Sequence, residues 1–433
     1  MNRDFLPSSA PVPDSLSEPP VSVSETRCCI AGGGPGGMVL GLLLARCGIP
    51  VIVLEAHADF DRDFRGDSIH PYTLELLELL GLLPSLLKLP HSRMDRVIFQ
   101  TGDQLIQVAD FHNCGCKYPY QVIMPQVDLL NLLAEQFAGL PHAEVRRQAH
   151  VQELLVDHGT VRGVRYRDPL GRCHEVRAAL TVGADGRHST VRKLAQIEPV
   201  QTSPPMDILW FRLPRQPTDA VQEQGVKVVF GKGKFCIITE RPGREWQIGY
   251  PIVKATFAQV RARGIEELRA NLIELLPAFA DRIAALQDFR RVAVLSTDSS
   301  LCRRWWRPGL LLIGDAAHVM SPVGGVGILH AVQDAVAAAL VLTRPLRQGR
   351  VTAADLAAVQ RRRHRAVRWT QRTQLLVHRW VIQPALAGIG LSKTPWYMRW
   401  FSRLPFQWGN SARWIARGYF PPSLEEVRKL LSG

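Results

Sequence analysis

Cys28-Cys29-Ile30-Ala31-Gly32-Gly33-Gly34-Pro35-Gly36-Gly37 is the stretch that decides the fold of this chain. An apolar run leads into a Gly-x-Gly-x-x-Gly pattern, and an apolar helical segment follows it. Val51–Glu55 then has the pattern of a second buried strand that ends in a carboxylate. Together these elements predict a βαβ unit that binds a dinucleotide. The glycines let a pyrophosphate approach the backbone at the helix N-terminus, and the acid binds the adenosine ribose.

Two later segments also place a small-residue turn after a short apolar strand. Gly183-Ala184-Asp185-Gly186-Arg187 follows one such strand, and Gly314-Asp315-Ala316-Ala317-His318 follows another. The aspartate of the later segment, Asp315, suits the ribityl hydroxyls of a flavin. The helix after Ser321–Gly327 presents N-terminal amides to the flavin edge that becomes anionic on reduction. Taken singly, the second segment is a common turn with Ser189 as a helix cap, and the third fits an ordinary strand–turn–helix.

The order of these three motifs resembles the class A FAD-dependent aromatic hydroxylases, which have the para-hydroxybenzoate hydroxylase fold. Arg65 and Gln126 match two further family positions, so the resemblance covers residues 27–343. It implies that NAD(P)H reduces a non-covalent FAD. It also implies that O2 forms a flavin C4a-hydroperoxide, which hydroxylates or epoxidises a small aromatic or conjugated substrate. The implied FAD contacts are Gly32, Gly34, Pro35, Gly37, Glu55, Arg65, Gln126, Asp185, Gly314, Asp315, Val326 and Gly327, and the implied catalytic loop positions are Pro322, Gly324, Gly325 and Gly327.

One family position differs in this chain. The family has an asparagine two residues after the last glycine of the loop, where this chain has Leu329, followed by His330. The loop amides still serve the flavin edge, but a side-chain contact is lost. His330 either replaces that contact or is a surface or core histidine of the helix.

The sequence argues against one class of flavoprotein and leaves two other functions open. It has no second dinucleotide fingerprint and no Cys-x4-Cys pair at Cys47, which argues against the two-dinucleotide disulfide reductases. A flavin-dependent reductase or dehydrogenase of the geranylgeranyl-reductase type shares the fold without inserting oxygen. A non-catalytic flavoprotein docked on a membrane is an alternative from a different class.

We therefore predict an α/β fold with a three-layer, Rossmann-like FAD-binding domain, a β-sheet substrate domain and a helical C-terminal unit. The predicted ranges are a disordered tail at 1–24, an FAD-binding domain at 25–94, 121–200 and 291–343, a substrate sheet at 95–120 and 201–290, and a basic, Trp-rich helical region at 344–433.

Aromatic residues in the predicted substrate sheet are candidates for the substrate pocket. Tyr120 is the first choice because it closely precedes Gln126; Phe211, Phe235 and Tyr250 are the others, with Tyr118, Trp210 and Phe230 as further candidates. Aromatic residues at strand spacing also occur as ordinary core residues.

The net charge of +14 is concentrated at one end of the chain. Residues 341–433 hold 17 Lys and Arg against 3 Asp and Glu, whereas residues 1–340 hold 36 of each. The basic run Arg361-Arg362-Arg363-His364-Arg365, with nearby tryptophans, suits either an anionic membrane surface or a solvated helical cap. Nucleic acid is not expected as a partner.

The chain has no secretory signal, and its eight cysteines and thirteen histidines show no metal-ligand spacing. The cysteines are expected to be free thiols. We expect no bound metal and a cytoplasmic protein, in possible peripheral contact with the membrane.

Overall fold

The computed structural model describes residues 20–61, 67–202, 204–217, 219, 225–388 and 405–433, without the side chains of 405–410. Arg65, Trp396 and Trp400 lie outside the described residues, as does most of the predicted tail. The tail was predicted to extend to residue 24, and this boundary is wrong. Strand β1 (Ser22–Ala31) begins inside it, because Ser22–Ser24 pair with the first residues of the long neighbouring strand Cys173–Gly183.

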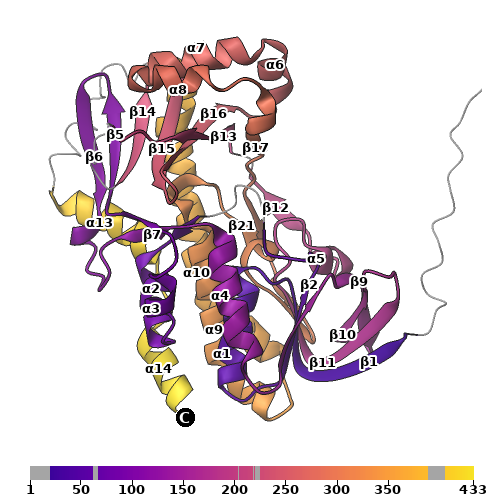
Figure 1. Ribbon diagram of the computed structural model, residues 1–433. Helices are drawn as coiled ribbons and strands as arrows, with labels where there is room; N and C mark the ends of the chain where they lie inside the picture. The colour runs from indigo at the N-terminus through magenta and orange to yellow at the C-terminus, as the bar shows by residue number, and fades with distance from the viewer. Residues whose placement is uncertain (1–19, 62–66, 203, 218, 220–224, 389–404) are drawn as a thin grey trace, which may run out of the picture.

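The first sheet forms the centre of the larger part of the molecule (Figure 1). Its strands run in the order β19-β20-β11-β1-β2-β8, and the four central ones are parallel. β10 pairs with the first half of β11, and β9 pairs with β10. The bounds are β2 (Val51–Glu55), β8 (Ala143–Arg147), β9 (His150–Asp157), β10 (Thr160–Arg167), β11 (Cys173–Gly183), β19 (Trp306–Arg307) and β20 (Leu310–Leu312).

Three helices cover one face of this sheet. In β1, Cys28 and Ile30 belong to the core under these helices, whereas Cys29 packs with residues of β9–β11 on the opposite face. This alternation is the two-residue period of a strand buried on both faces. The helices are α1 (Pro35–Arg46), α4 (Gln126–Ala138) and α9 (Gly327–Arg347). The mixed α/β fold predicted from the sequence is confirmed.

The second sheet has the order β17-β13-β16-β15-β14-β5-β6 and is almost entirely antiparallel. Helices α7 (Ile265–Leu275) and α8 (Ala280–Ala284) cover one of its faces (Figure 1). β17 belongs to it although residues 291–343 were predicted with the first sheet. The bounds are β5 (Arg96–Thr101), β6 (Gln104–Asp110), β13 (Met206–Pro214), β14 (Gly225–Phe230), β15 (Phe235–Arg241), β16 (Glu245–Val253) and β17 (Ala293–Leu295).

The C-terminal helices pack against both parts. α10 (Ala353–Val377) lies along α9 and continues through a π-helical turn (His378–Ile382) into α11 (Gln383–Leu386). α13 (Pro405–Arg417) contacts β6, and α14 (Leu424–Ser432) contacts α9 and α2 (Pro71–Leu79).

One helical stretch, Val323–Arg347, is long and apolar enough to span a membrane. The most apolar 18 residues of this stretch are 72% buried inside the protein, as expected for a core helix. Its composition is therefore explained by packing.

Candidate active site

The three glycine motifs meet at one edge of the first sheet. Ala31, at the end of β1, pairs with Gly183 at the end of β11, and Gly183 pairs with Leu312 at the end of β20. Residues far apart in sequence thus follow the carboxyl ends of three adjacent parallel strands. Ligands of open parallel sheets bind outside this edge.

The first turn explains each glycine of its pattern. Gly32 has φ +108°, and a Cβ there would lie 2.3 Å from the carbonyl oxygen of Ala184. A Cβ at Gly37 would lie 2.0 Å from the carbonyl oxygen of Gly32, so this glycine lets α1 pack on the strand. A Cβ at Gly34 would meet nothing within 4 Å, which leaves room in front of the α1 N-terminus. The open space is where a pyrophosphate needs to approach.

Glu55 is fixed beside this turn. Its side chain is buried, its Oε2 accepts a hydrogen bond from the Gly33 amide at 2.8 Å, and its Oε1 accepts one from the His57 amide at 2.9 Å. The carboxylate is therefore held at the end of β2, the position predicted for ribose binding.

The second turn touches the first and is braced internally. The Asp185 carboxylate accepts hydrogen bonds from the Ser189 hydroxyl and the Val191 amide. Burial raises the pKa of Asp185, although these hydrogen bonds act against the shift. Asp185 thus lies near the glycine turn, as expected, but its carboxylate organises its own loop.

Arg192 connects the second turn to the third. This buried guanidinium donates hydrogen bonds to the carbonyl oxygens of Ala316, at 3.1 Å, and Arg187, at 2.9 Å. Sequence reasoning did not single out Arg192. It lies one helical turn after the Ser189 cap, where nothing in the sequence pattern distinguishes a buried arginine from an exposed one.

The third turn leads into a loop that only glycine fits well. Half-buried Asp315 sits in the short turn Gly314–Ala316. Gly324 and Gly325 have φ values of +82° and +64°, in the left-handed region that disfavours other residues. α9 then begins at Gly327, where a Cβ would meet nothing within 4 Å. Open space therefore lies before the N-terminal amides of α9, as it does before α1.

Two side chains pack on Gly324 of the loop. The Nε2 atom of His70 lies 3.4 Å from the carbonyl oxygen of Gly324, and the Trp414 indole lies against the same glycine. Burial lowers the pKa of His70 to about 4, so its imidazole is neutral near pH 7. The loop is thus held between α2 and α13.

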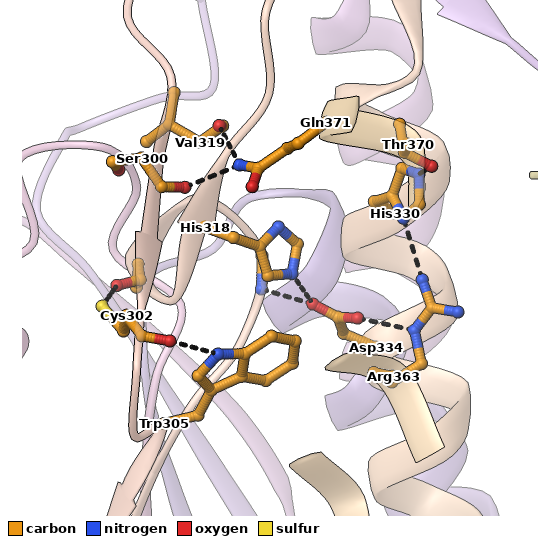
Figure 2. A network of polar contacts seen from close by, with 12 residues as sticks. Ser300, Cys302, Trp305, His318, Val319, His330, Asp334, Arg363, Thr370 and Gln371 are labelled. Atoms are coloured by element: carbon orange, nitrogen blue, oxygen red, sulfur yellow. Dashed lines mark hydrogen bonds and ion pairs between the residues drawn. The ribbon is translucent and has the colours of Figure 1, made fainter. Parts of the chain in front are cut away.

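A buried polar network lies behind the third turn (Figure 2). Asp334 on α9 accepts hydrogen bonds from the Gly314 amide at 2.9 Å and from His318 Nε2 at 2.6 Å. Arg363 on α10 donates from Nε to the other oxygen of Asp334 at 2.8 Å, and from Nη2 to His330 Nδ1 at 2.9 Å. His330 Nε2 therefore carries the proton and donates to Thr370. The Asp334 carboxylate of α9 thus joins the third turn to α10.

The charges in this network are fixed. Burial alone raises the pKa of Asp334, but His318 and Arg363 together bring it below its ordinary value. Burial, followed by the Arg363 charge, lowers the pKa of His330 well below its usual value. The network therefore holds an ionised Asp334–Arg363 pair and a neutral His330 at neutral pH.

The structure decides between alternatives that the sequence left open for His330, and it corrects the placement of Arg363. Arg363 was expected on a helix face that meets either a membrane surface or solvent, but it is completely buried while Arg361 and Arg365 are exposed. His330 has both ring nitrogens engaged in the core, so it does not replace the missing asparagine. Leu329 itself is buried in the main core. The helical spacing of Leu356, Val359, Arg363, Ala366 and Thr370 is the signal that would have placed Arg363 on the inner face.

The second sheet turns one aromatic face toward the loop. Phe230, Phe235 and Trp210 belong to an apolar cluster that also includes Val323 of the loop, with Ile382 and Ala385 of the C-terminal helices packed on the same face. Phe230 stacks on Phe235 with a centroid separation of 5.3 Å. The Trp210 ring lies over Gly249 on the neighbouring strand, where a Cβ would lie 2.8 Å from the indole. Through Val323, this face of the sheet meets the loop that was predicted to border the flavin.

Two predicted substrate residues lie on the wrong face. Phe211 and Tyr250 belong to the cluster under α7 and α8, because strand alternation turns them away from Trp210 and Phe235. Tyr120 packs against the core between the first sheet and its helices, with the Arg93 guanidinium 4.6 Å from its ring centroid. Of the four residues chosen from the sequence, Phe235 is the one that belongs to the loop-facing cluster.

The described residues fit FAD. Open space lies before two helix N-termini, a fixed carboxylate lies at the end of β2, and Asp315 follows β20, two strands from β1 along the same sheet edge. Gln126 is the first residue of α4 and is half-buried. No group of three or more His, Cys, Asp or Glu among the described residues could hold a metal ion.

Comparison with known proteins agrees with this geometry. A family model described as an FAD binding domain matches residues 25–373. The chain belongs to this FAD-binding family. It is 31% identical over 403 residues to 6-methylpretetramide 4-monooxygenase of Streptomyces rimosus, covering 90% of this chain and 94% of the relative. Such coverage makes the relationship one of whole chains.

Two further relatives are hydroxylases. A probable NADH-specific resorcinol 4-hydroxylase of Rhodococcus jostii is 28% identical over 310 residues, covering 71% of this chain but only 56% of the relative. The structure of OxyS, an anhydrotetracycline hydroxylase from Streptomyces rimosus, is similar with a TM-score of 0.70 and 26% identity, covering 90% of this chain and 76% of OxyS. The chain is therefore an FAD-dependent monooxygenase that uses NAD(P)H. The reductase alternative is not favoured.

Proposed function

We propose that this monooxygenase hydroxylates a planar, polycyclic phenolic substrate. The observation that carries the proposal is the aromatic cluster of Trp210, Phe230 and Phe235 packed together with Val323 of the loop. A wall of flat rings suits a flat, fused-ring substrate, because offset stacking adds to the hydrophobic gain. The names of the 6-methylpretetramide monooxygenase and the anhydrotetracycline hydroxylase, both relatives, support this substrate class.

We assign the cofactor contacts as follows. The α1 N-terminus and Gly34 would take the pyrophosphate, Glu55 the adenosine ribose and Asp315 the ribityl chain. The open N-terminus of α9 would face the flavin edge and stabilise negative charge there. When bound, FAD accepts a hydride from NAD(P)H and activates O2. The protein's own part is to hold the rings in register and to keep water from the loop.

The described polar groups fit this division of labour. Asp334 holds the Gly314 amide and so fixes the turn that carries Asp315. Gly324 is covered by His70 and Trp414, which excludes water from one side of the loop. The substrate would be oriented by ring stacking on the second sheet.

The test is a substrate panel with the FAD-loaded protein. NADH and NADPH oxidation is measured with monocyclic phenols and with fused three- and four-ring phenols, and mass spectrometry detects the gain of one oxygen atom. We expect the fused-ring compounds to stimulate oxidation and to be hydroxylated. Efficient hydroxylation of monocyclic phenols alone would contradict the proposed substrate class while leaving the monooxygenase assignment intact.

A matched pair of variants locates the pocket. Trp210→Leu removes a ring from the loop-facing side, and Trp246→Leu removes one from the side under α7 and α8. We expect Trp210→Leu to raise KM by roughly tenfold or more, as for the loss of one buried aromatic contact. Trp246→Leu should leave KM unchanged. Equal effects of the two changes would contradict the placement.

We also propose a cytoplasmic location for this enzyme. All eight cysteines are free, and Cys116 is the one that is not fully buried. Unpaired thiols are typical of a reducing compartment. Finding the protein in a secreted or periplasmic fraction would contradict this.

A further inference from the structure

The outer face of α10 carries a stripe of arginine and large apolar residues. We call this stripe the α10 outer face. Its inner side packs on α9 and the first sheet (Figure 1), so only the outer side reaches solvent. The exposed residues at helical spacing are Arg361, Arg365, Arg368, Trp369, Arg372, Leu375 and Leu376 of α10, with Arg379 and Trp380 of the π-helical turn that continues it.

The apolar members of this face are strongly exposed. Trp369 is 43% exposed, Leu376 57% and Trp380 55%. Scattered apolar residues are normal on a surface, but tryptophan is rarely left this open. These side chains therefore need a partner that accepts apolar groups.

The arginines lie at the same level as the rings. The Arg372 guanidinium is 5.9 Å from the Trp369 ring centroid, and that of Arg379 is 5.5 Å from the Trp380 ring centroid. Arg365 lies over the exposed Phe420 at 4.4 Å. Cationic groups thus sit beside exposed rings along the whole face.

The charge on this face is unbalanced. The sequence has no Asp or Glu between Asp355 and Glu425. Among described residues, the Glu426 carboxylate pairs with Arg362, which lies at one end of the stripe. The remaining arginines of the face attract anions over a length of about 28 Å at 1.5 Å per residue.

We infer that the α10 outer face docks on an anionic lipid bilayer. Tryptophan and leucine favour the boundary between head groups and acyl chains, and arginine binds anionic head groups. A second copy of this chain fits poorly, because a two-fold contact would oppose one arginine stripe to another. Nucleic acid would satisfy the arginines but not Leu375 and Leu376. The inference does not rest on the substrate proposed above.

The experiment is vesicle co-sedimentation with full-length, FAD-loaded protein. Vesicles of phosphatidylcholine alone are compared with vesicles that also contain phosphatidylglycerol. The first variant changes Arg365, Arg368, Arg372 and Arg379 to serine. A control changes Arg162, Arg261, Arg263 and Arg290, which are exposed elsewhere, to serine. Both variants lower the net charge equally.

We expect the parent to bind anionic vesicles and to release them at high salt. Each arginine near an anionic surface contributes roughly fivefold, so the four-arginine variant should bind at least 100-fold more weakly. The control should bind like the parent. Binding lost equally in both variants would overturn the inference, because net charge alone would then explain it.

The tryptophans separate lipid from other polyanions. Trp369→Ser with Trp380→Ser should lower vesicle binding by at least about tenfold and leave retention on a DNA oligonucleotide unchanged. Unchanged vesicle binding by this variant, or DNA binding by a parent that binds no vesicles, would overturn the lipid assignment. NAD(P)H oxidation should be equal in all forms, which shows that the variants are folded.

Discussion

Arg363→Met breaks the buried ion pair behind the third glycine turn. Arg363 and Asp334 are both 0% exposed, and the Nε–Oδ1 distance is 2.8 Å. The change leaves the Asp334 carboxylate in the core without its cationic partner, although the Gly314 amide and His318 still donate to it. Removing one member of a buried pair costs about 3–5 kcal/mol of unfolding free energy. We therefore expect a loss in this range.

The neighbouring residue supplies the control. Arg362 has the same side chain and directly precedes Arg363, but its pair with Glu426 is half-exposed on both sides. Such exposed pairs contribute about 0–1 kcal/mol. Urea unfolding of Arg362→Met should therefore differ little from that of the parent. The same two variants should also differ in FAD retention. Asp334 accepts from the Gly314 amide in the turn that carries Asp315, so Arg363→Met should weaken FAD binding and Arg362→Met should not.

A double-mutant cycle tests the pairing itself. Asp334→Asn combined with Arg363→Met removes both charges while keeping an oxygen that can accept the Gly314 amide. We expect the double variant to be at least about 2 kcal/mol more stable than the sum of the two single losses predicts. A loss below about 1 kcal/mol for Arg363→Met, or additive effects in the cycle, would refute the reasoning.

Three other changes test the loop and the turns. Gly34→Val places a side chain in the open space before α1 and should release FAD on gel filtration, measured by flavin absorbance. Trp414→Ala uncovers Gly324 and should raise the fraction of NAD(P)H oxidation that yields peroxide rather than product, whereas Trp414→Phe should preserve coupling. Burial holds the pKa of His70 at about 4, so below about pH 6.5 the unfolded chain gains a proton there that the folded protein does not. The contribution of His70 to stability is thus complete above pH 6.5 and should fall by about 3 kcal/mol toward pH 4, and His70→Gln should reduce the pH slope of urea unfolding by this amount.

Each of these tests has an outcome that contradicts it. Gly34→Val that keeps its full flavin content would move the pyrophosphate away from α1. Equal peroxide yields from the alanine and phenylalanine variants of Trp414 would remove its role as a cover. A slope in His70→Gln that matches the parent and the exposed control His158→Gln would place the titration elsewhere.

Local chemistry made the nucleotide-binding turns readable in the sequence. Gly32 and Gly37 are required by close backbone contacts, and a glycine turn between a buried strand and a helix is recognisable from sequence order alone. The family, the cofactor and the monooxygenase reaction followed from three such motifs in order. The contacts of Arg65 remain a prediction.

Side-chain direction in the second sheet was decided by tertiary structure. Phe211 and Trp210 are adjacent, and the sequence does not say which of them packs under α7 and α8 and which packs with Val323 and Ile382 on the opposite face. A strand buried on both faces has no polar side to mark its orientation. Packing of α7 and α8 chose the face, so Phe211 and Tyr250 became core residues while Phe235 faced the loop.

The sequence by itself determined the βαβ unit, because glycine conformation and strand periodicity act over a few residues. Only the tertiary structure determined what the basic C-terminal run does. Its helix buries Arg363 against Asp334 and exposes the arginines on either side. A burial difference between residues two apart depends on which side of α10 meets α9. The spacing of Leu356, Val359 and Ala366 marks an inner side of the helix, but only the packing of whole helices brings Asp334 to Arg363 there.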